Sequence, residues 1–145
     1  MSLLLNPSFE NGTTNWKKVS HADEVTYEVH KTGEKGVVAR SGDYYLVAKT
    51  NVSGGSFAQD ITVTDMRSVT GIAWIRALKG NVTGSFHIWN LNVGVVTNRF
   101  AVGTEWSILT PTLELTGSSS PKNLRFEFYI DTPGTYLVVD GVNGF

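Results

Sequence analysis

The sequence contains no cysteine, no excess of charge of one sign and no long hydrophobic segment. Without cysteine, the chain cannot form disulfides, zinc–thiolate sites or a thiol nucleophile. The 12 Lys and Arg residues and the 13 Asp and Glu residues give a formal net charge of −1 without a basic stripe, which argues against a nucleic-acid partner. No apolar run reaches the length of a membrane span. Residues 1–5 are too short for a signal peptide, so we expect any export signal to lie outside this sequence.

What the sequence does contain is glycine, with 15 residues, and short segments rich in β-branched and aromatic residues. Many of these segments alternate between apolar and polar residues, which is typical of half-buried strands, and no window shows a helical period. We therefore predict an all-β fold, a β-sandwich jelly roll of two antiparallel sheets that forms a single domain over residues 1–145. The expected strands are 25–30, 44–49, 57–63, 69–78, 85–89, 93–102, 106–115, 124–130 and 136–142.

One expected strand, residues 85–89, has two chemically different faces. Side chains alternate across a strand, so Phe86 and Ile88 point to one side, while Ser85, His87 and Trp89 point to the other. The first pair suits a hydrophobic core. The second set places an aromatic ring and a polar ring on the opposite side, which forms a binding surface if that side is open to solvent.

The same two-faced pattern is repeated in two further expected strands. Trp74 and Arg76 alternate with small apolar residues in 69–78, and Arg125, Glu127 and Tyr129 alternate with larger ones in 124–130. If these faces lie on one sheet, they form a platform on which aromatic rings stack against sugar rings, at roughly 1 kcal/mol per contact if aromatic pairs are the guide. Charged side chains are rarely buried in a closed core, so a wet groove accounts for them well. The predicted carbohydrate-binding residues are Trp74, Arg76, His87, Trp89, Arg125, Glu127 and Tyr129.

The same face would also suit a covered position or an enzyme. It could pack under a loop or another domain, or meet a protein partner in a structural or adhesive module. A glycosidase needs two carboxylates about 5–10 Å apart, for which Glu127 and, if its strand places it there, Asp60 are the candidates. His87, Tyr129 and Arg125 would be the set for a lyase. No paired-acid motif stands out, so we expect binding without catalysis.

Several segments together resemble carbohydrate-binding modules of families four, nine, sixteen and twenty-two. Residues 4–12 (L-L-N-P-S-F-E-N-G), followed by Trp16, are similar to the N-x-x-F-E-x-G … W opening of these families. Residues 73–77 (A-W-I-R-A) are similar to their A-W-V-R-A segment, which supports Trp74 as an aromatic residue of the binding face. Each match is short, but the matches follow the family order along the whole chain. The other matching segments are 41–46 (S-G-D-Y-Y-L), 58–63 (A-Q-D-I-T-V), 103–106 (G-T-E-W) and 139–142 (V-D-G-V).

The resemblance implies a jelly-roll module that binds polysaccharide without cutting it. The implied partners are a polysaccharide or oligosaccharide of the β-glucan, xylan or mannan type and a covalently linked catalytic domain, usually a secreted glycoside hydrolase. We accordingly expect an extracellular monomer with no nucleic-acid or membrane partner. Two positions depart from the pattern: Gly141 stands where the family has a second acid, and Gly71 stands where a bulkier core residue is usual.

The resemblance also implies a structural calcium ion. In such modules the acid of the opening motif and the first aspartate of the closing motif bind the ion, and these positions are Glu10 and Asp140 here. Carbonyl groups near Ser8 and in the loop from Arg40 to Asp43 would complete a shell of oxygen ligands. Such a site would join both ends of the chain to a middle loop. Without the resemblance, these two carboxylates would be read as surface charges.

Overall fold

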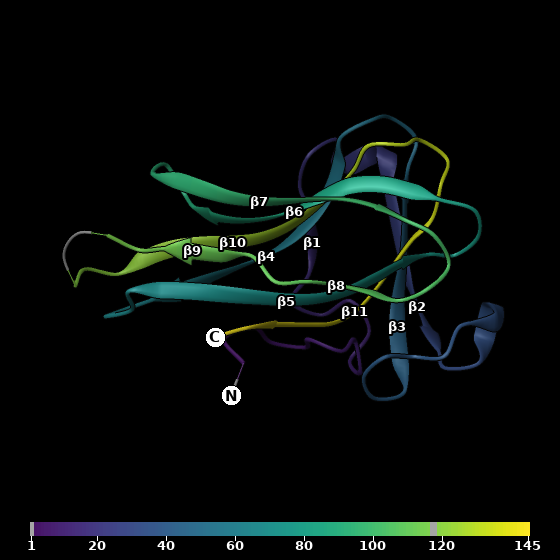
Figure 1. Ribbon diagram of the computed structural model, residues 1–145, viewed down its shortest axis with the longest axis horizontal. Coiled ribbons are helices and arrows are strands. Elements are labelled where there is room, and N and C mark those ends of the chain that lie inside the picture. Colours follow the sequence, from purple (N-terminus) through teal and green to yellow (C-terminus); the bar gives the residue numbers. More distant parts are fainter. Residues whose placement is uncertain (1, 117–118) are drawn as a thin grey trace.

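The computed structural model describes residues 2–116 and 119–145 and contains two β-sheets packed face to face (Figure 1). Within these residues the regular structure is eleven strands and two short 3-10 helices. Every strand pairing among them is antiparallel. The predicted all-β sandwich of two antiparallel sheets is therefore confirmed.

The first sheet has five strands in the order β1-β4-β10-β6-β7. Its central strand, β10, pairs with β4 on one side and with β6 on the other. The short strand β1 and the long strand β7 form its two edges. The strand bounds are β1 Lys17–Lys18, β4 Gly55–Val63, β6 Val82–Asn90, β7 Gly94–Val102 and β10 Lys122–Ile130.

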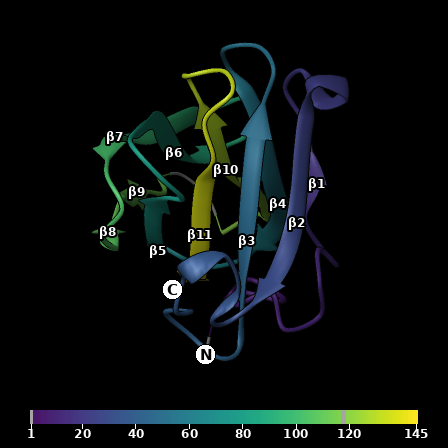
Figure 2. The same ribbon diagram turned by 90° about the vertical axis from the view of Figure 1, so that its right-hand side faces the viewer.

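The second sheet has the order β2-β3-β11-β5-β8, and β9 also pairs with β5. Figure 2 shows β2, β3, β11 and β5 side by side. The pairing of β11 with β5 is interrupted by a register shift between Asp140 and Asn143. The bounds are β2 Val25–Lys31, β3 Tyr44–Thr50, β5 Ser68–Ala77, β8 Ser107–Leu109, β9 Thr112–Glu114 and β11 Leu137–Gly144, with the 3-10 helices η1 Ala22–Glu24 and η2 Glu34–Gly36.

The hydrophobic core fills the space between the two sheets. Phe86, Phe126 and Phe128 are fully buried, and the rings of Phe86 and Phe128 stack with their centroids 4.4 Å apart. Burial of one large apolar side chain stabilises a fold by about 1.5–3 kcal/mol. Gly71 lets the facing sheet approach closely, because a Cβ at this position would lie 2.9 Å from Ile88 Cδ1 and 3.2 Å from Phe86 Cε2. Side chains of the first sheet therefore take the space that a larger residue at this position would need.

The strand predicted over residues 106–115 is two short strands. Both β8 and β9 pair with β5, but the chain leaves the ladder between them at Pro111. Proline has no N–H group to donate, so it interrupts a continuous ladder. Its carbonyl oxygen instead accepts a hydrogen bond from Gly71 N at 2.8 Å. The prediction of one long strand is therefore wrong here.

Two of the four tryptophans have structural roles. Trp16 is buried in the core, and its ring centroid lies 5.4 Å from that of Phe9 and 6.4 Å from that of Phe57. Trp106 packs against a smaller apolar cluster of the second sheet, and its Nε1 donates a hydrogen bond to the carbonyl oxygen of Val38 at 3.0 Å. This cluster consists of Val37, Tyr45, Val47 and Val138. The other two tryptophans, on β5 and β6, are described with the candidate site.

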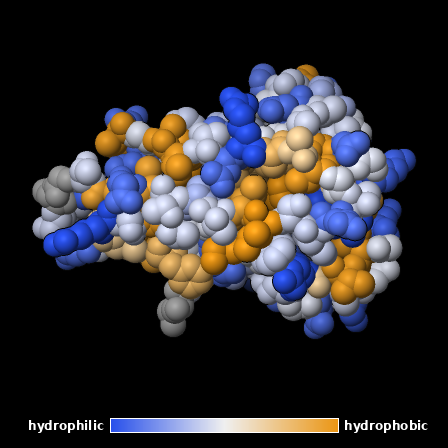
Figure 3. All heavy atoms as spheres, in the orientation of Figure 1, coloured by the Kyte–Doolittle hydropathy of each residue, from blue (hydrophilic) through white to orange (hydrophobic). Residues whose placement is uncertain are grey.

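The outer surface mixes apolar and polar residues. Figure 3 shows them interspersed on the side of the molecule that faces the viewer. Exposed apolar side chains of the chain include Val93, Val95 and Ile108. None of the helices in the described part of the chain is long and apolar enough to cross a membrane.

Candidate functional site

The central strands of the first sheet bring five of the predicted binding residues onto one outward face. In the pairing of β10 with β6, Arg125 lies opposite Trp89, Glu127 opposite His87, and Tyr129 further along β10. The core residues of the same strands alternate with them and point to the other side. The alternation in the sequence therefore predicted these two strands correctly. We call this surface the aromatic face, and it consists of Ser85, His87, Trp89, Arg125, Glu127 and Tyr129.

Three rings of the aromatic face contact one another. His87 and Trp89 are stacked, with centroids 5.5 Å apart and 10° between their planes. Tyr129 meets His87 edge-on at 4.7 Å. All three residues are half-buried, so part of each ring is open to a ligand. Stacked and edge-to-face contacts are favourable, and they hold the rings in a defined arrangement.

Glu127 supports the aromatic face from beneath. It is only 1% exposed. Its Oε1 accepts a hydrogen bond from Trp89 Nε1 at 2.9 Å, and its Oε2 accepts one from Ser56 Oγ at 2.6 Å. This carboxylate therefore fixes the orientation of Trp89. It is not placed to bond sugar hydroxyls directly, in contrast to the role that the sequence suggested.

Burial shifts the pKa values of the two polar rings of the aromatic face in the direction that favours their uncharged forms. Burial lowers the pKa of His87, and its two ring nitrogens form hydrogen bonds with Ser85 Oγ at 2.8 Å and Thr97 Oγ1 at 3.1 Å. Burial also raises the pKa of Tyr129 to about 12, and the negative charge of Glu127 acts in the same direction. Neutral rings that can donate and accept hydrogen bonds suit a neutral, hydroxyl-rich ligand.

Arg125 is held by an acid on the neighbouring strand. Its Nε lies 2.7 Å from Asp60 Oδ1 and its Nη2 lies 3.0 Å from Asp60 Oδ2. Lys17 Nζ also lies 2.8 Å from Asp60 Oδ2. The hydrogen bond from Arg125 is the main reason why the pKa of Asp60 is lowered. Such a two-pronged pair is strong and specific, so the charge of Arg125 is already matched within the protein.

The edge strand β7 adds residues that the sequence reasoning missed. Thr97 lies opposite His87, Val95 lies opposite Trp89, and Arg99 is the next outward residue after Thr97. Val95 is 42% exposed beside the indole. The alternation of Val95, Thr97 and Arg99 along 93–102 could have placed them on the same face. This side of the strand has no aromatic residue, so the pattern did not point to a binding surface.

Trp74 and Arg76 do not belong to the aromatic face. Their strand, β5, is part of the second sheet, so the prediction that three strands share one platform is wrong for this strand. The guanidinium carbon of Arg40 lies 4.0 Å from the ring centroid of Trp74. Arg76 Nε donates a hydrogen bond to the carbonyl oxygen of Ala77 at 3.0 Å, and its guanidinium lies over the ring of Trp106. Both side chains therefore have partners within the protein.

A shallow hollow of about 300 Å³ adjoins the aromatic face near Asp60. Thr62, Leu91 and Asn123 line it, and Thr62 Oγ1 donates a hydrogen bond to Asn123 Oδ1 at 3.0 Å. In the ladder, Asp60 lies opposite Arg125, so the hollow continues the aromatic face along the strands. It adds an apolar side chain and an amide to the surface that a long ligand could contact.

The residues expected to bind calcium come together around the loop 40–43. Both carboxylate oxygens of Glu10 accept hydrogen bonds from Asp43 N, at 3.0 and 3.2 Å. Asp140 Oδ2 accepts hydrogen bonds from Arg40 N at 2.7 Å and from Ser41 N at 2.8 Å. The opening segment, the middle loop and the last strand therefore meet at one place, as the resemblance implies.

The donor set at this place suits a hard cation. Asp140 is fully buried, and burial raises its pKa to about 6, with a further contribution from the negative charge of Glu10. The hydroxyl oxygens of Ser8 and Ser41 lie 2.8 Å apart beside it. Two carboxylates with neutral oxygens are the ligands that Ca²⁺ prefers. Within residues 2–116 and 119–145, however, no three His, Cys, Asp or Glu residues form a metal-binding group, so backbone and hydroxyl oxygens would have to contribute.

Known proteins are similar to this chain in structure rather than in sequence. No protein-family model matches the sequence, and no curated protein matches it either. The carbohydrate-binding module TmCBM61, solved with β-1,4-galactotriose, is 18% identical with a TM-score of 0.66, over 100% of this chain and 98% of that chain. A solved CBM4 module is 14% identical with a TM-score of 0.72, over 97% of each chain.

A third structure contains the CBM22-1 and GH10 modules of the Clostridium thermocellum endo-1,4-β-D-xylanase 10B, complexed with xylohexaose. It is 9% identical with a TM-score of 0.70, over 99% of this chain and 28% of that chain. At these identities the likeness concerns the fold. The chain therefore has the jelly-roll fold of solved carbohydrate-binding modules over nearly its whole length.

Proposed function

We propose that this protein is a non-catalytic carbohydrate-binding module that holds a neutral polysaccharide on the aromatic face. The observation that carries the proposal is the half-buried ring of Trp89, which buried Glu127 anchors at 2.9 Å and which stacks on His87. An aromatic ring held in place on a sheet offers a fixed apolar surface to the C–H groups of a sugar ring. The fold that the chain shares with carbohydrate-binding modules supports this function.

Hydrogen-bonding groups gather around His87, the ring on which Trp89 stacks. The hydroxyl groups of Ser85, Thr97 and Tyr129 can both donate and accept hydrogen bonds, and the imidazole of His87 lies among them. Sugar hydroxyl groups need partners of both kinds. The combination of a stacking surface and mixed hydrogen-bonding groups therefore matches a polyhydroxylated ligand better than an apolar one.

The expected ligand is an uncharged β-linked chain, such as a β-glucan, xylan or mannan. An acidic sugar would have to displace Asp60 from Arg125, because their paired groups already satisfy each other. Two proteins of the same fold were solved with β-1,4-galactotriose and with xylohexaose. These ligands support neutral β-linked chains and add β-galactan to the candidates.

A catalytic role suits these residues poorly. Asp60 and Glu127 do lie on the same side of the sheet, as a pair of catalytic acids would require. However, Arg125 lowers the pKa of Asp60, which opposes proton donation. Glu127 is 1% exposed, and both of its carboxylate oxygens accept hydrogen bonds. A glycosidase needs an acid with a raised pKa that can reach the scissile bond, so we favour binding without cleavage.

The module would act outside the cell as part of a longer protein with a catalytic domain. In the xylanase structure of this fold, a CBM22 module and a GH10 module are present together. A module that binds the polysaccharide keeps a linked enzyme close to its substrate and raises the effective substrate concentration.

A structural calcium ion forms a second part of this proposal. The carboxylates of Glu10 and Asp140 would hold it, with carbonyl groups near Ser8 and between Arg40 and Asp43. A bound cation would offset the repulsion between the two carboxylates, which contributes to the raised pKa of Asp140. Its role would be to stabilise the contact between the chain ends and the middle loop.

A glycan array tests the proposed function most broadly. The wild-type protein should bind at least one neutral β-linked polysaccharide, and Trp89→Ala should bind it roughly tenfold or more weakly while its thermal unfolding stays cooperative. A folded wild-type protein that binds no neutral glycan on the array would reject the proposal. Sedimentation that shows a stable oligomer, together with such a result, would favour a protein-interaction module instead.

A further inference from the structure

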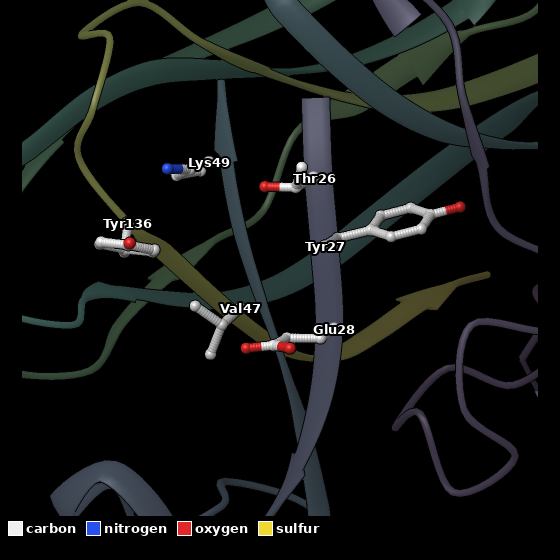
Figure 4. Close-up of a pocket in the computed structure, with 6 residues that line it drawn as sticks. All are labelled: Thr26, Tyr27, Glu28, Val47, Lys49 and Tyr136. Atoms are coloured by element: carbon white, nitrogen blue, oxygen red, sulfur yellow. The ribbon is translucent and has the colours of Figure 1, made fainter. Parts of the chain in front are cut away.

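A second hollow, of about 180 Å³, lies on the outer side of the second sheet (Figure 4). Val47 of β3 forms its floor and is buried. Thr26 and Glu28 of β2 lie on one side of it, and Tyr136, just before β11, lies on the other, with Lys49 above the floor. These residues are separate from the aromatic face, which belongs to the other sheet.

Tyr136 is held in place before any ligand arrives, its side chain by packing and its backbone by a hydrogen bond. It packs against the smaller apolar cluster of the second sheet, and the carbonyl oxygen of Tyr136 accepts a hydrogen bond from Leu78 N at 3.1 Å. Tyr136 is half-buried and lines the hollow, and Lys49 Nζ lies over its ring, 5.7 Å from the centroid. A ring fixed in this way loses little conformational freedom when a ligand stacks on it. The cluster consists of Val37, Tyr45, Val47 and Val138.

A cation, Lys49, and an anion, Glu28, both line this hollow and are not paired with each other. Lys49 lies opposite Thr26, so Glu28 is its diagonal neighbour on the same side of the sheet, a distance that long side chains can span. None of the ion pairs among the described residues joins Lys49 to Glu28. Glu28 Oε1 instead lies 2.9 Å from His30 Nε2. The amino group of Lys49, a strong donor, and the carboxylate of Glu28, a strong acceptor, therefore lie on different sides of the hollow. The hydroxyl of Thr26 lies on the same strand as Glu28.

We infer that this hollow is a second sugar-binding site that takes one pyranose ring, as a chain end or a side branch. Tyr136 supplies the stacking surface, Lys49 donates hydrogen bonds, Glu28 accepts them, and Thr26 does both. A fixed ring, a donor and an acceptor around a small apolar floor are what one neutral sugar ring requires. The choice of sugar as the ligand rests on the proposed function, whereas the site itself rests on its own contacts. Two sites on opposite sheets would let one molecule hold two glycan segments, which strengthens attachment without new contacts at either site.

Titration of the ¹⁵N-labelled Trp89→Ala protein by NMR tests this inference, because that variant lacks the first site. The probes are methyl β-D-glucopyranoside, methyl β-D-xylopyranoside and methyl β-D-galactopyranoside. At least one should shift the amide signals of Thr26, Lys49 and Tyr136 in a saturable way. Adding Tyr136→Ala should weaken this binding roughly tenfold, the size of about one aromatic stacking contact.

Two further variants test the proposed donor and provide its control. Lys49→Met retains the apolar stem and removes the donor, so it should also weaken the binding. Lys31→Met, at the exposed far end of β2, is the matched control and should leave the titration unchanged. If Tyr136→Ala does not fold, as its amide dispersion would show, the comparison of Lys49→Met with Lys31→Met tests the second site on its own.

The inference is overturned if no glycoside gives saturable shifts around the hollow. It is also overturned if Lys49→Met titrates like the Trp89→Ala parent. These outcomes differ from failure of the proposed function. If Trp89→Ala binds polysaccharide as the wild type does while the hollow still titrates, the aromatic face fails and the second site stands.

Discussion

The indole nitrogen of Trp89 donates a hydrogen bond to the buried carboxylate of Glu127 on the neighbouring strand, at 2.9 Å. The other oxygen of the same carboxylate accepts a hydrogen bond from Ser56 Oγ of β4. One buried acid therefore joins three strands beneath the proposed ligand. Hydrogen bonds to a charged group contribute about 1.5–3 kcal/mol each, so the orientation of Trp89 is strongly held.

Glu127→Ala should weaken both the fold and ligand binding. The change leaves the Trp89 and Ser56 donors without their acceptor, which costs about 1–3 kcal/mol for each buried group. Urea unfolding and calorimetric titration with the polysaccharide measure the two effects. Glu114→Ala, an exposed acid on β9, serves as the control. If Glu127→Ala kept wild-type affinity, the orientation of Trp89 would not depend on Glu127.

His87 should make stability depend on pH. Burial lowers its pKa below the ordinary value of 6.5, so the unfolded chain takes up a proton more readily than the folded protein. The stability that neutral His87 supplies is therefore present above about pH 6.5 and is lost as the pH falls through the lowered pKa. Asp140 acts in the opposite direction over this range, because burial raises its pKa to about 6 and the folded protein takes up that proton more readily. The test is therefore the difference between two proteins: from pH 7 to pH 5 the free energy of unfolding, measured in urea, should change less favourably in the wild type than in His87→Gln. An equal change in both proteins would contradict this account.

Asp60→Asn should change which glycans are bound. The substitution removes the carboxylate that pairs directly with the guanidinium of Arg125. Because the pair is partly exposed, we expect a loss of stability below about 1 kcal/mol. Retention on polygalacturonate in affinity electrophoresis should rise relative to retention on a neutral polysaccharide. If retention rose no more than in Asp23→Asn, a control in η1, Asp60 would not set the preference for neutral ligands.

Calcium should raise the melting temperature if Glu10 and Asp140 form the proposed site. Binding at 100 times the Kd adds about 2.7 kcal/mol, which corresponds to roughly 5–10 °C for a chain of 145 residues. Scanning calorimetry in excess CaCl₂ and in EGTA measures the difference. Asp140→Asn should abolish it, whereas Asp65→Asn should not. Equal melting temperatures in both buffers, with no metal found by elemental measurement, would reject the site.

Local alternation in the sequence was sufficient to assign the two faces of β6 and β10. In a strand the direction of a side chain depends only on a period of two, so Phe86 is buried while His87 and Trp89 point outward. The meeting of Glu10 and Asp140 at one loop came only from the resemblance to known modules. Neither residue lies in a local pattern that would suggest a shared site.

Sheet membership could not be predicted in the same way. Strands β5 and β6 follow each other in the chain but lie in different sheets, so the outward residue Trp74 is far from the aromatic face in the topology. Buried Glu127 accepts a hydrogen bond from Ser56, which lies 71 residues away in the sequence. Both features are set by long-range pairing, which a pattern within one strand does not contain.

Calorimetric titration of two tryptophan variants tests the central claim most directly, with the neutral polysaccharide that the wild type binds on the array. Trp89→Ala should lose roughly tenfold or more in affinity, as expected for a stacking ring. Trp74→Phe keeps a ring beneath Arg40 on the other sheet and should bind as the wild type does. If Trp74→Phe lost the affinity and Trp89→Ala kept it, the ligand would not lie on the aromatic face.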